Sequence, residues 1–260
     1  MGNFSKSPES IDGFKVFAKK LSFESGQIIK SYFRTKLRIE LKSDLSPVTL
    51  ADKKSEEAMR ELIMKEFPEH GILGEEFGIY NPDAEYKWIL DPIDGTKSFI
   101  SGTPLFGTLI ALLKNGEPII GAINLPVLNE FLIGDNSTAE LNDKKVSVRN
   151  CGSISSALLL TTDILDIEKH QDINKFNALV KKVKLFRIWG DCYGYYLVAT
   201  GFADIMIDPV LSPWDSMALI PVIRGAGGNI TDYQGNDPLK GKSIIASSPS
   251  IHEEILKILN

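Results

Sequence analysis

The chain has 260 residues, of which 43% are hydrophobic and 24% are charged, as in an ordinary globular protein. This length allows a large buried core, either as one domain or as two closely packed ones. The formal net charge of −5 argues against nucleic acid and anionic membrane surfaces as partners.

The localisation that the sequence predicts is cytoplasmic. No segment approaches the roughly 20 apolar residues of a membrane span, and the N-terminal MGNFSKSPES lacks the apolar stretch of a signal peptide. Cys151 and Cys192 are the two cysteines, and they have no metal-type spacing. We therefore expect both thiols to be reduced.

Two amphipathic helices are predicted near the N-terminus. Between residues 10 and 36 apolar residues recur at approximately helical spacing, and Gly26 in mid-pattern favours a kink. Thr49 is suited to cap a second helix, which Phe67-Pro68 ends. Asp52 lies on its first turn, where an acid is more often a surface residue favoured by the helix dipole than a ligand.

Strands dominate the rest of the first half. A short strand over residues 72–74 leads to Glu75 and Glu76. Neighbouring side chains on a strand point to opposite faces, so one acid at most faces a common site. A β-meander is predicted with a turn at Asn115-Gly116. Its strands cover residues 106–113, 118–124 and 131–134, and an exposed hairpin follows over 135–147.

The segment from Trp88 to Thr96 carries the strongest chemical signal. Trp88-Ile89-Leu90 reads as a buried strand end, followed at once by Asp91 and Asp94. Two carboxylates placed together beside apolar strands oppose each other's ionisation, and a divalent cation removes the conflict. Oxygen ligands favour Mg²⁺ or Mn²⁺ over Zn²⁺. Gly95-Thr96 then opens a short helix whose free N–H groups suit a phosphate.

The second half alternates strands and helices. Asp191 is a candidate cap for one of the helices, and Gly201 suits its end. The predicted elements are strands over 157–162, 184–188 and 203–208, and helices over 172–183 and 191–201.

A further helix begins at Ser212-Pro213-Trp214-Asp215, with a cap residue, a proline at the first position and an acid at the third. It continues to Gly225, and Pro221 is expected to kink it. By itself Asp215 needs no role beyond capping.

Several of these motifs resemble one family. Asp91-Pro92-Ile93-Asp94-Gly95-Thr96 resembles the signature of the inositol monophosphatase superfamily of Mg²⁺-dependent, lithium-sensitive phosphatases. Trp214-Asp215, opening a glycine-terminated helix, is similar to its second signature. Gly74-Glu75-Glu76 and Val48-Thr49 with Asp52 also resemble family segments. The resemblance extends from about residue 40 to about residue 230.

The resemblance implies a ligand set for two Mg²⁺ ions, which Mn²⁺ can replace. Glu75, Asp91 and the backbone carbonyl of Ile93 would hold the first ion. Asp91 would bridge to a second ion, held also by Asp94 and Asp215. Asp52 would reach a third, loosely held ion through water, with Lys42 nearby.

The resemblance also implies catalytic roles. Thr96 would orient the attacking water beside Glu75, while Asp94 and the N–H groups of Gly95 and Thr96 would contact the phosphate. Phosphoryl transfer asks for positioning and charge neutralisation, so no Cys, Ser or His nucleophile is required. The three histidines, which are expected on the surface, are His70, His170 and His252.

Substrate choice is expected in the second half, where Arg187, Asp191 and Asp208 lie at element ends. The segment from Gly190 to Tyr195 resembles the histidinol-phosphate phosphatase branch. An acid at Asp191 can pair with a cationic amino alcohol, whereas a neutral polyol offers no such charge. The predicted reaction is hydrolysis of L-histidinol phosphate. The alternatives are an inositol-1-phosphatase and, in another class, a non-catalytic metal- or phosphate-binding module.

The expected fold is a layered α/β/α/β/α sandwich of the inositol monophosphatase and fructose bisphosphatase type. Residues 1–150 would form an α+β half with most metal ligands, and residues 151–260 an α/β half that selects the substrate. The two halves are expected to pack tightly and may be counted as one domain. The family resemblance also implies a homodimer.

Overall fold

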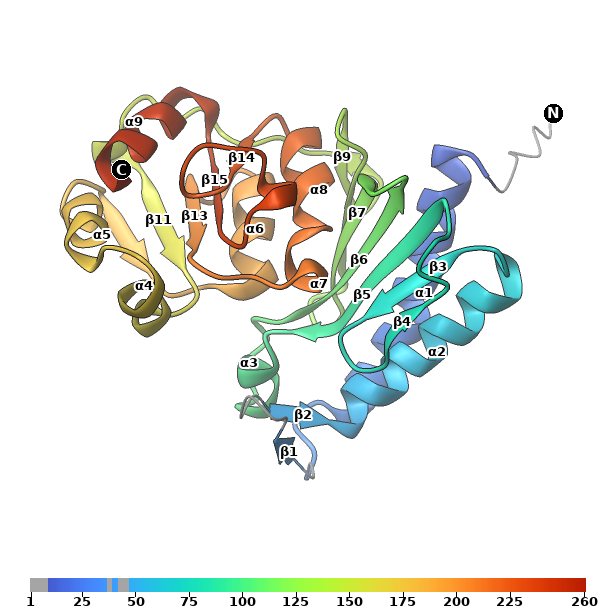
Figure 1. The fold of residues 1–260 in the computed structure, drawn as a ribbon. Helices are drawn as coiled ribbons and strands as arrows, with labels where there is room; N and C mark the ends of the chain where they lie inside the picture. Colours follow the sequence, from blue (N-terminus) through green and yellow to red (C-terminus); the bar gives the residue numbers. More distant parts are fainter. Residues whose placement is uncertain (1–8, 37–38, 42–46) are drawn as a thin grey trace.

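The protein is described by a computed structural model that covers residues 9–36, 39–41 and 47–260. Its elements form five successive layers, α/β/α/β/α, because an eight-stranded sheet and a five-stranded sheet are each covered by helices on both faces (Figure 1). This order of layers confirms the predicted sandwich.

The eight-stranded sheet is mostly antiparallel, in agreement with the predicted β-meander. Its spatial order is β10-β9-β8-β7-β6-β5-β3-β4, in which β3 and β5 are parallel and the other neighbours antiparallel. The meander turn is confirmed, with Asn115 and Gly116 both at positive φ. The strands are β3 Gly71–Gly74, β4 Gly78–Tyr80, β5 Tyr86–Asp94, β6 Gly107–Lys114, β7 Glu117–Leu125, β8 Glu130–Gly134, β9 Ala139–Leu141 and β10 Lys144–Lys145.

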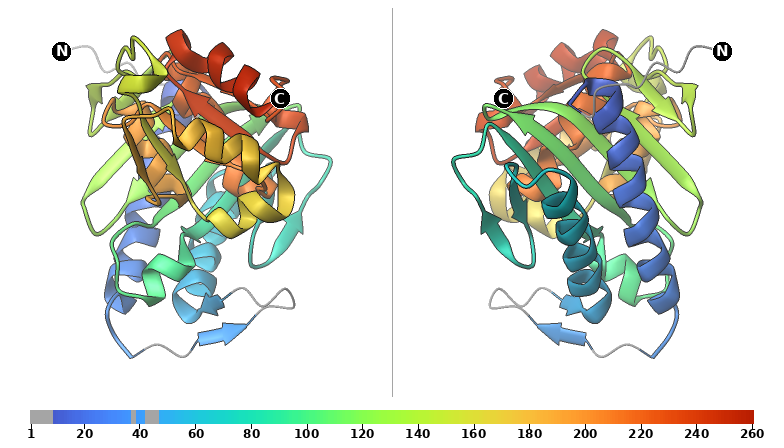
Figure 2. Two further views of the ribbon diagram at one scale, coloured as in Figure 1. Left: turned by 90° about the vertical axis from the view of Figure 1, so that its left-hand side faces the viewer. Right: turned by 90° about the vertical axis from the view of Figure 1, so that its right-hand side faces the viewer.

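Helices α1 (Ile11–Tyr32) and α2 (Leu50–Glu66) cover one face of this sheet (Figure 2, right). Phe17 of α1 packs edge-on against Trp88 of β5, with ring centroids 5.4 Å apart. Gly26 does not end α1, which continues through it to Tyr32. A Cβ at Gly26 would lie 3.3 Å from Asn124 and Pro126, so the glycine serves the close approach of α1 to the sheet.

The five-stranded sheet belongs to the second half. Its order is β12-β11-β13-β15-β14, with β12, β11 and β13 parallel and β15 antiparallel to both neighbours. Helices α6 and α8 lie between the two sheets, and α4, α5 and α9 cover the outer face (Figure 1). The strands are β11 Leu158–Thr161, β12 Leu185–Arg187, β13 Ile205–Asp208, β14 Asn229–Thr231 and β15 Ile244–Ser247. The helices are α4 Ile164–His170, α5 Ile173–Val180, α6 Asp191–Ala199, α8 Leu219–Gly225 and α9 Pro249–Leu259.

The shorter elements complete the chain. They are the antiparallel pair β1 Ile39–Leu41 and β2 Pro47–Thr49, the helices α3 Thr96–Ile100 and α7 Pro213–Ser216, and the 3₁₀ turns Ile154–Ser156 and Pro238–Lys240. Within the described ranges, no helix combines the length and the apolar character that a membrane crossing requires.

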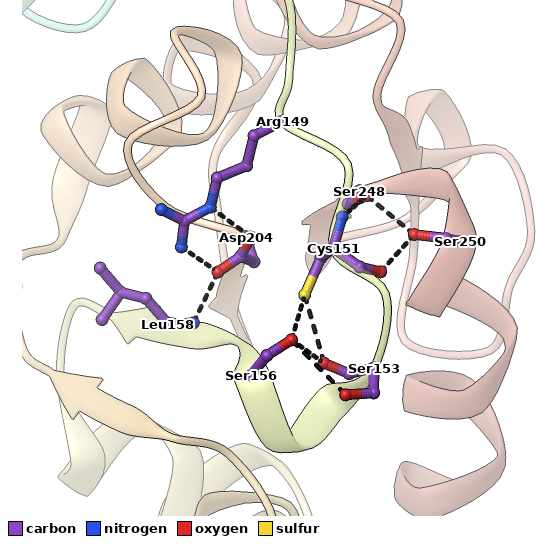
Figure 3. Close-up of polar contacts among 8 residues, drawn as sticks. All are labelled: Arg149, Cys151, Ser153, Ser156, Leu158, Asp204, Ser248 and Ser250. Atoms are coloured by element: carbon purple, nitrogen blue, oxygen red, sulfur yellow. Dashed lines mark hydrogen bonds and ion pairs between the residues drawn. The ribbon is translucent and has the colours of Figure 1, made fainter.

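The two halves share a hydrophobic cluster. It joins β6 and β7 of the first sheet, through Leu109 and Ile123, to Val198 of α6 and Val222 of α8. Polar contacts also hold the segment that links the two halves, from Arg149 to Leu158 (Figure 3). Buried Asp204 accepts hydrogen bonds from the Arg149 guanidinium and from the backbone N–H of Leu158.

Two expectations for the second half are wrong. The helix predicted from Ser212 to Gly225 is two helices, α7 and α8, and the break falls at Met217-Ala218. The break agrees with the interruption expected from Pro221, because proline has no N–H to donate to the carbonyl of Met217, four residues before it; Met217 and Ala218 keep helical backbone angles. Asp191 does not cap α6; Gly190 is the N-cap residue, and Asp191 is the first helical residue with φ +50°.

Two of the three histidines are buried, contrary to the expectation of surface positions. His70 is 5% exposed and stacks on Phe67, and its Nδ1 accepts a hydrogen bond from Trp88 Nε1 at 3.1 Å. His252 is 1% exposed and is hydrogen-bonded to Ser247 through Nδ1 at 2.7 Å. Burial lowers the pKa of both imidazoles. His170 is exposed, as predicted.

Candidate active site

The end of β5 directs Asp91 and Asp94 into one cavity. Residues three apart on a regular strand face opposite sides, but the pairing of β5 with β6 is irregular between these two positions. Asp91 Oδ1 accepts a hydrogen bond from the Ile93 N–H at 3.0 Å, and Thr108 Oγ1 donates to the Pro92 carbonyl at 2.9 Å. These bonds fix the bulge that brings both aspartates to the cavity wall.

Asp215 reaches the same cavity from the second half of the chain. It is the third residue of α7, and its Oδ2 accepts a hydrogen bond from the Ser212 N–H at 2.8 Å. One carboxylate oxygen each of Asp91, Asp94 and Asp215 lies within 4.8 Å of the others. Asp215 thus both takes part in capping α7 and supplies the third carboxylate of the cluster.

The three carboxylates are in electrostatic conflict. Burial raises the pKa of Asp91 well above its usual range, and the charges of Glu75 and Asp94 raise it further. Burial likewise raises the pKa of Asp94, with Asp191 the largest charge contribution. The pKa of Asp215 is raised to about 7, mainly by burial. Such a cluster of oxygen donors fits a hard divalent cation, which would offset the repulsion and hold the groups ionised.

Glu75 stands beside this cluster. It follows β3 directly, and its N–H donates to the Leu90 carbonyl at 3.1 Å, next to Asp91. Its carboxyl group is close enough to Asp91 to raise the pKa of that residue. Glu75 and Ile93 both line the cavity, so the structure brings together the five residues predicted to hold metal. The Ile93 carbonyl accepts a hydrogen bond from Thr96 Oγ1 at 3.0 Å.

Gly95 allows the chain to turn from β5 into α3. Its φ is +89°, and a Cβ there would lie 2.9 Å from Asp191 Oδ2 and 3.0 Å from the Leu105 carbonyl oxygen. Gly95 and Thr96 both line the cavity beside the carboxylates. A larger residue at position 95 would therefore meet a backbone carbonyl and displace Asp191.

Asp52 lies close to the site without lining its cavity. It is 1% exposed, and its Oδ2 accepts hydrogen bonds from the Thr49 N–H at 2.8 Å and from Thr49 Oγ1 at 2.6 Å. Burial raises the pKa of Asp52 to about 6, with smaller contributions from the charges of Glu76 and Glu75. Lys42 falls outside the described residues.

The three predicted substrate residues have different positions. Asp191 lines the cavity, and burial raises its pKa to about 7. Asp208 also lines it, but both of its oxygens are engaged: Oδ1 by the Thr162 N–H at 3.2 Å and Oδ2 by the Tyr195 hydroxyl at 2.9 Å. Arg187 is exposed, lies over the ring of Trp189 and does not line this cavity.

Two cavity acids were missed from the sequence. Asp163 and Asp166, at the start of the unpredicted helix α4, line the cavity together with Asp191. Asp163 caps α4 through a hydrogen bond from the Leu165 N–H at 2.9 Å, and its Oδ2 lies 3.9 Å from Lys97 Nζ. The two acids stand three residues apart, immediately after a buried strand. This pattern is the same signal that identified Asp91 and Asp94.

Comparisons with known proteins identify the family of this five-layer fold and its carboxylate cluster. Residues 11–260 match the inositol monophosphatase family, to which the chain belongs. It is 42% identical to "Bifunctional phosphatase IMPL2, chloroplastic" from Arabidopsis thaliana over 97% of this chain and 77% of that one. It is 36% identical to "Histidinol-phosphatase" from Chlorobaculum parvum over 92% of this chain and 93% of the relative.

Solved structures agree with this assignment. An inositol monophosphatase from Zymomonas mobilis superposes with a TM-score of 0.86 at 36% identity, covering 96% of this chain and 99% of that one. The protein is therefore a phosphatase of a generally metal-dependent family, as the sequence signatures predict.

Proposed function

We propose that the protein hydrolyses L-histidinol phosphate to L-histidinol and phosphate, with Mg²⁺ as its cofactor. The proposed substrate rests on a group of three further acids in the cavity wall, Asp163, Asp166 and Asp191, which we call the acidic wall. These acids are not members of the cluster formed by Asp91, Asp94 and Asp215. A substrate with an ammonium group finds opposite charge there, whereas a neutral polyol does not. The name of the Chlorobaculum relative supports the same substrate.

The acidic ligand set supports two Mg²⁺ ions, which Glu75, Asp91, Asp94, Asp215 and the Ile93 carbonyl would hold. Asp52, whose pKa is raised by burial and in part by the charge of Glu75, would reach a third ion through water. When bound, the cations supply neutralisation of the phosphate charge and activation of the attacking water. All donors are oxygen atoms, so Mn²⁺ can replace Mg²⁺.

The other residues bind and orient. The Thr96 hydroxyl donates a hydrogen bond to the Ile93 carbonyl, so the lone pairs of Oγ1 remain able to accept a hydrogen bond from the attacking water. The N–H groups of Gly95 and Thr96 are the proposed phosphate contacts beside Asp94. Asp208 is bonded to Thr162 and Tyr195 and thus positions the wall rather than pairing with the substrate.

The substrate proposal is tested by comparing kcat/KM for L-histidinol phosphate and for myo-inositol 1-phosphate in Mg²⁺. The variant pair is Asp163→Asn with Asp166→Asn, because Asn still caps a helix. We expect the double variant to lose at least about tenfold in kcat/KM for histidinol phosphate, or roughly 1.4 kcal/mol, and to keep its turnover of the inositol ester. Glu168→Gln, on the exposed side of α4, is the control. Equal losses for both esters would contradict the proposal.

Hydrolysis of myo-inositol monophosphate is the second candidate, and the Zymomonas structure supports it. A wild-type preference for the inositol ester, unchanged by removal of the acidic wall, would favour it.

We also propose a cytoplasmic homodimer. Leu185, Ile188 and Trp189 expose 37%, 52% and 39% of their surfaces close together along the chain, and a second copy would cover them. Light scattering measures the mass. A monomer at micromolar concentration would contradict this proposal.

A further inference from the structure

The carboxylate of Glu56 is buried against the turn that carries Glu75. Glu56 lies on α2, and its side chain is 0% exposed. Oε2 accepts a hydrogen bond from the Glu76 N–H at 2.7 Å, and Oε1 accepts one from the Phe77 N–H at 3.2 Å. Arg60 Nε donates to Oε1 at 3.0 Å. Glu56 therefore binds the backbone of the two residues that directly follow Glu75.

The opposite side of the turn is fixed by β5. The β3–β5 ladder ends with Gly74 opposite Leu90, and the Glu75 N–H donates to the Leu90 carbonyl. A Cβ at Gly74 would lie only 1.9 Å from Glu56 Oε1, so glycine is what permits the carboxylate to come this close. The backbone of Glu75 is thus held between β5 and Glu56.

Hydrophobic packing contributes little to this turn. Phe77 and Ile79 are 51% and 55% exposed, and the neighbouring β4 is the edge strand of the sheet. On the α2 side, hydrogen bonds to the buried Glu56 carboxylate therefore hold the backbone of Glu76 and Phe77. Arg60 lies over the Phe77 ring and donates to the Gly78 carbonyl just beyond the turn. Burying a carboxylate is costly unless its oxygens are bonded, and here each oxygen has a backbone partner.

We propose that Glu56 is a positioning residue for the metal-dependent reaction: it holds the turn from Glu75 to Phe77 and so directs the Glu75 carboxylate toward Asp91. Glu56 does not line the cavity and acts only through Glu75. Substitution of a residue that orients a metal ligand without binding the metal itself typically lowers metal affinity or activity about 10- to 100-fold.

The test compares Glu56→Gln with Glu57→Gln, its exposed neighbour on the same helix. Gln has the same shape as Glu, but one of its two terminal groups is an NH₂ that cannot accept a hydrogen bond. One of the two backbone N–H groups that donate to the Glu56 carboxylate would therefore lose its acceptor. Mn²⁺ binding is measured by calorimetry, and folding by urea denaturation in EDTA. We expect E56Q to bind Mn²⁺ about 10- to 100-fold more weakly, with kcat largely recovered at saturating Mn²⁺. E57Q should stay within about twofold of wild type.

The proposal is overturned if folded E56Q binds Mn²⁺ within twofold of wild type, or if E57Q weakens binding as much. If E56Q does not fold, Gly74→Ala decides, because its methyl group displaces the same carboxylate from the other side. Weakened Mn²⁺ binding by G74A supports the proposal, and unchanged binding overturns it. Wild type that binds no Mn²⁺ refutes the proposed cofactor instead, so the two failures are distinguishable.

Discussion

Replacing Asp215 by Asn should stabilise the metal-free protein while removing a metal ligand. Asp215 has its pKa raised from 3.8 to about 7, mainly by burial. A carboxyl group with a raised pKa binds its proton more tightly in the folded state. The free energy of unfolding therefore falls progressively as pH rises from about 4 to about 7 and Asp215 ionises.

The magnitude follows from the shift. A change from 3.8 to about 7 is roughly three pH units, and at 1.36 kcal/mol per unit it corresponds to about 4 kcal/mol. This value is an upper limit, because solvent reaches part of the Asp215 side chain. Asn can keep the cap, since its amide oxygen can accept the Ser212 N–H that Oδ2 accepts.

The assay is urea denaturation in EDTA at pH 8 and at pH 4. D215N should exceed wild type in free energy of unfolding by about 2–4 kcal/mol at pH 8 and by little at pH 4. Adding Mg²⁺ should stabilise wild type far more than the variant. A variant no more stable than wild type in EDTA at pH 8 would refute the reasoning about the cluster.

Two further substitutions probe the site and the interface between layers. Asp94→Asn should lower Mg²⁺-dependent phosphate release by more than about a hundredfold with an unchanged circular dichroism spectrum; near-wild-type turnover would exclude Asp94 as a ligand. Gly121→Ala should destabilise the fold by about 1–3 kcal/mol, because a Cβ on β7 would lie 1.9 Å from the Ala218 carbonyl oxygen; an unchanged melting temperature would contradict this close packing.

The layers and the carboxylate cluster could be predicted because their signals are local. Buried strands, capped helix starts and acids directly after strands follow from short-range chemistry, which places Asp91, Asp94 and Asp215 on their elements. Their convergence depended on the family resemblance, since Asp215 lies far along the chain.

The remaining site residues depend on tertiary contacts. Helix α4 has only seven residues, too few for a clear period, so Asp163 and Asp166 had no predicted element. Glu56 stands in a charged run that resembles a solvated helix face. The sequence signal for its burial was its position four residues after Asp52, because this spacing places both side chains on the same face of α2, where both are buried.

His70 shows a third kind of limit. Its burial depends on the indole N–H of Trp88, a partner 18 positions away that only the folded chain supplies.

The central claim is that side chains from both halves of the chain bind cations together. An anomalous difference map from crystals soaked in MnCl₂ tests it most directly. We expect peaks between the carboxylates of Glu75, Asp91, Asp94 and Asp215. A map without density there, or with Mn²⁺ bound elsewhere while Glu75 and Asp215 turn away from Asp91, would contradict the account.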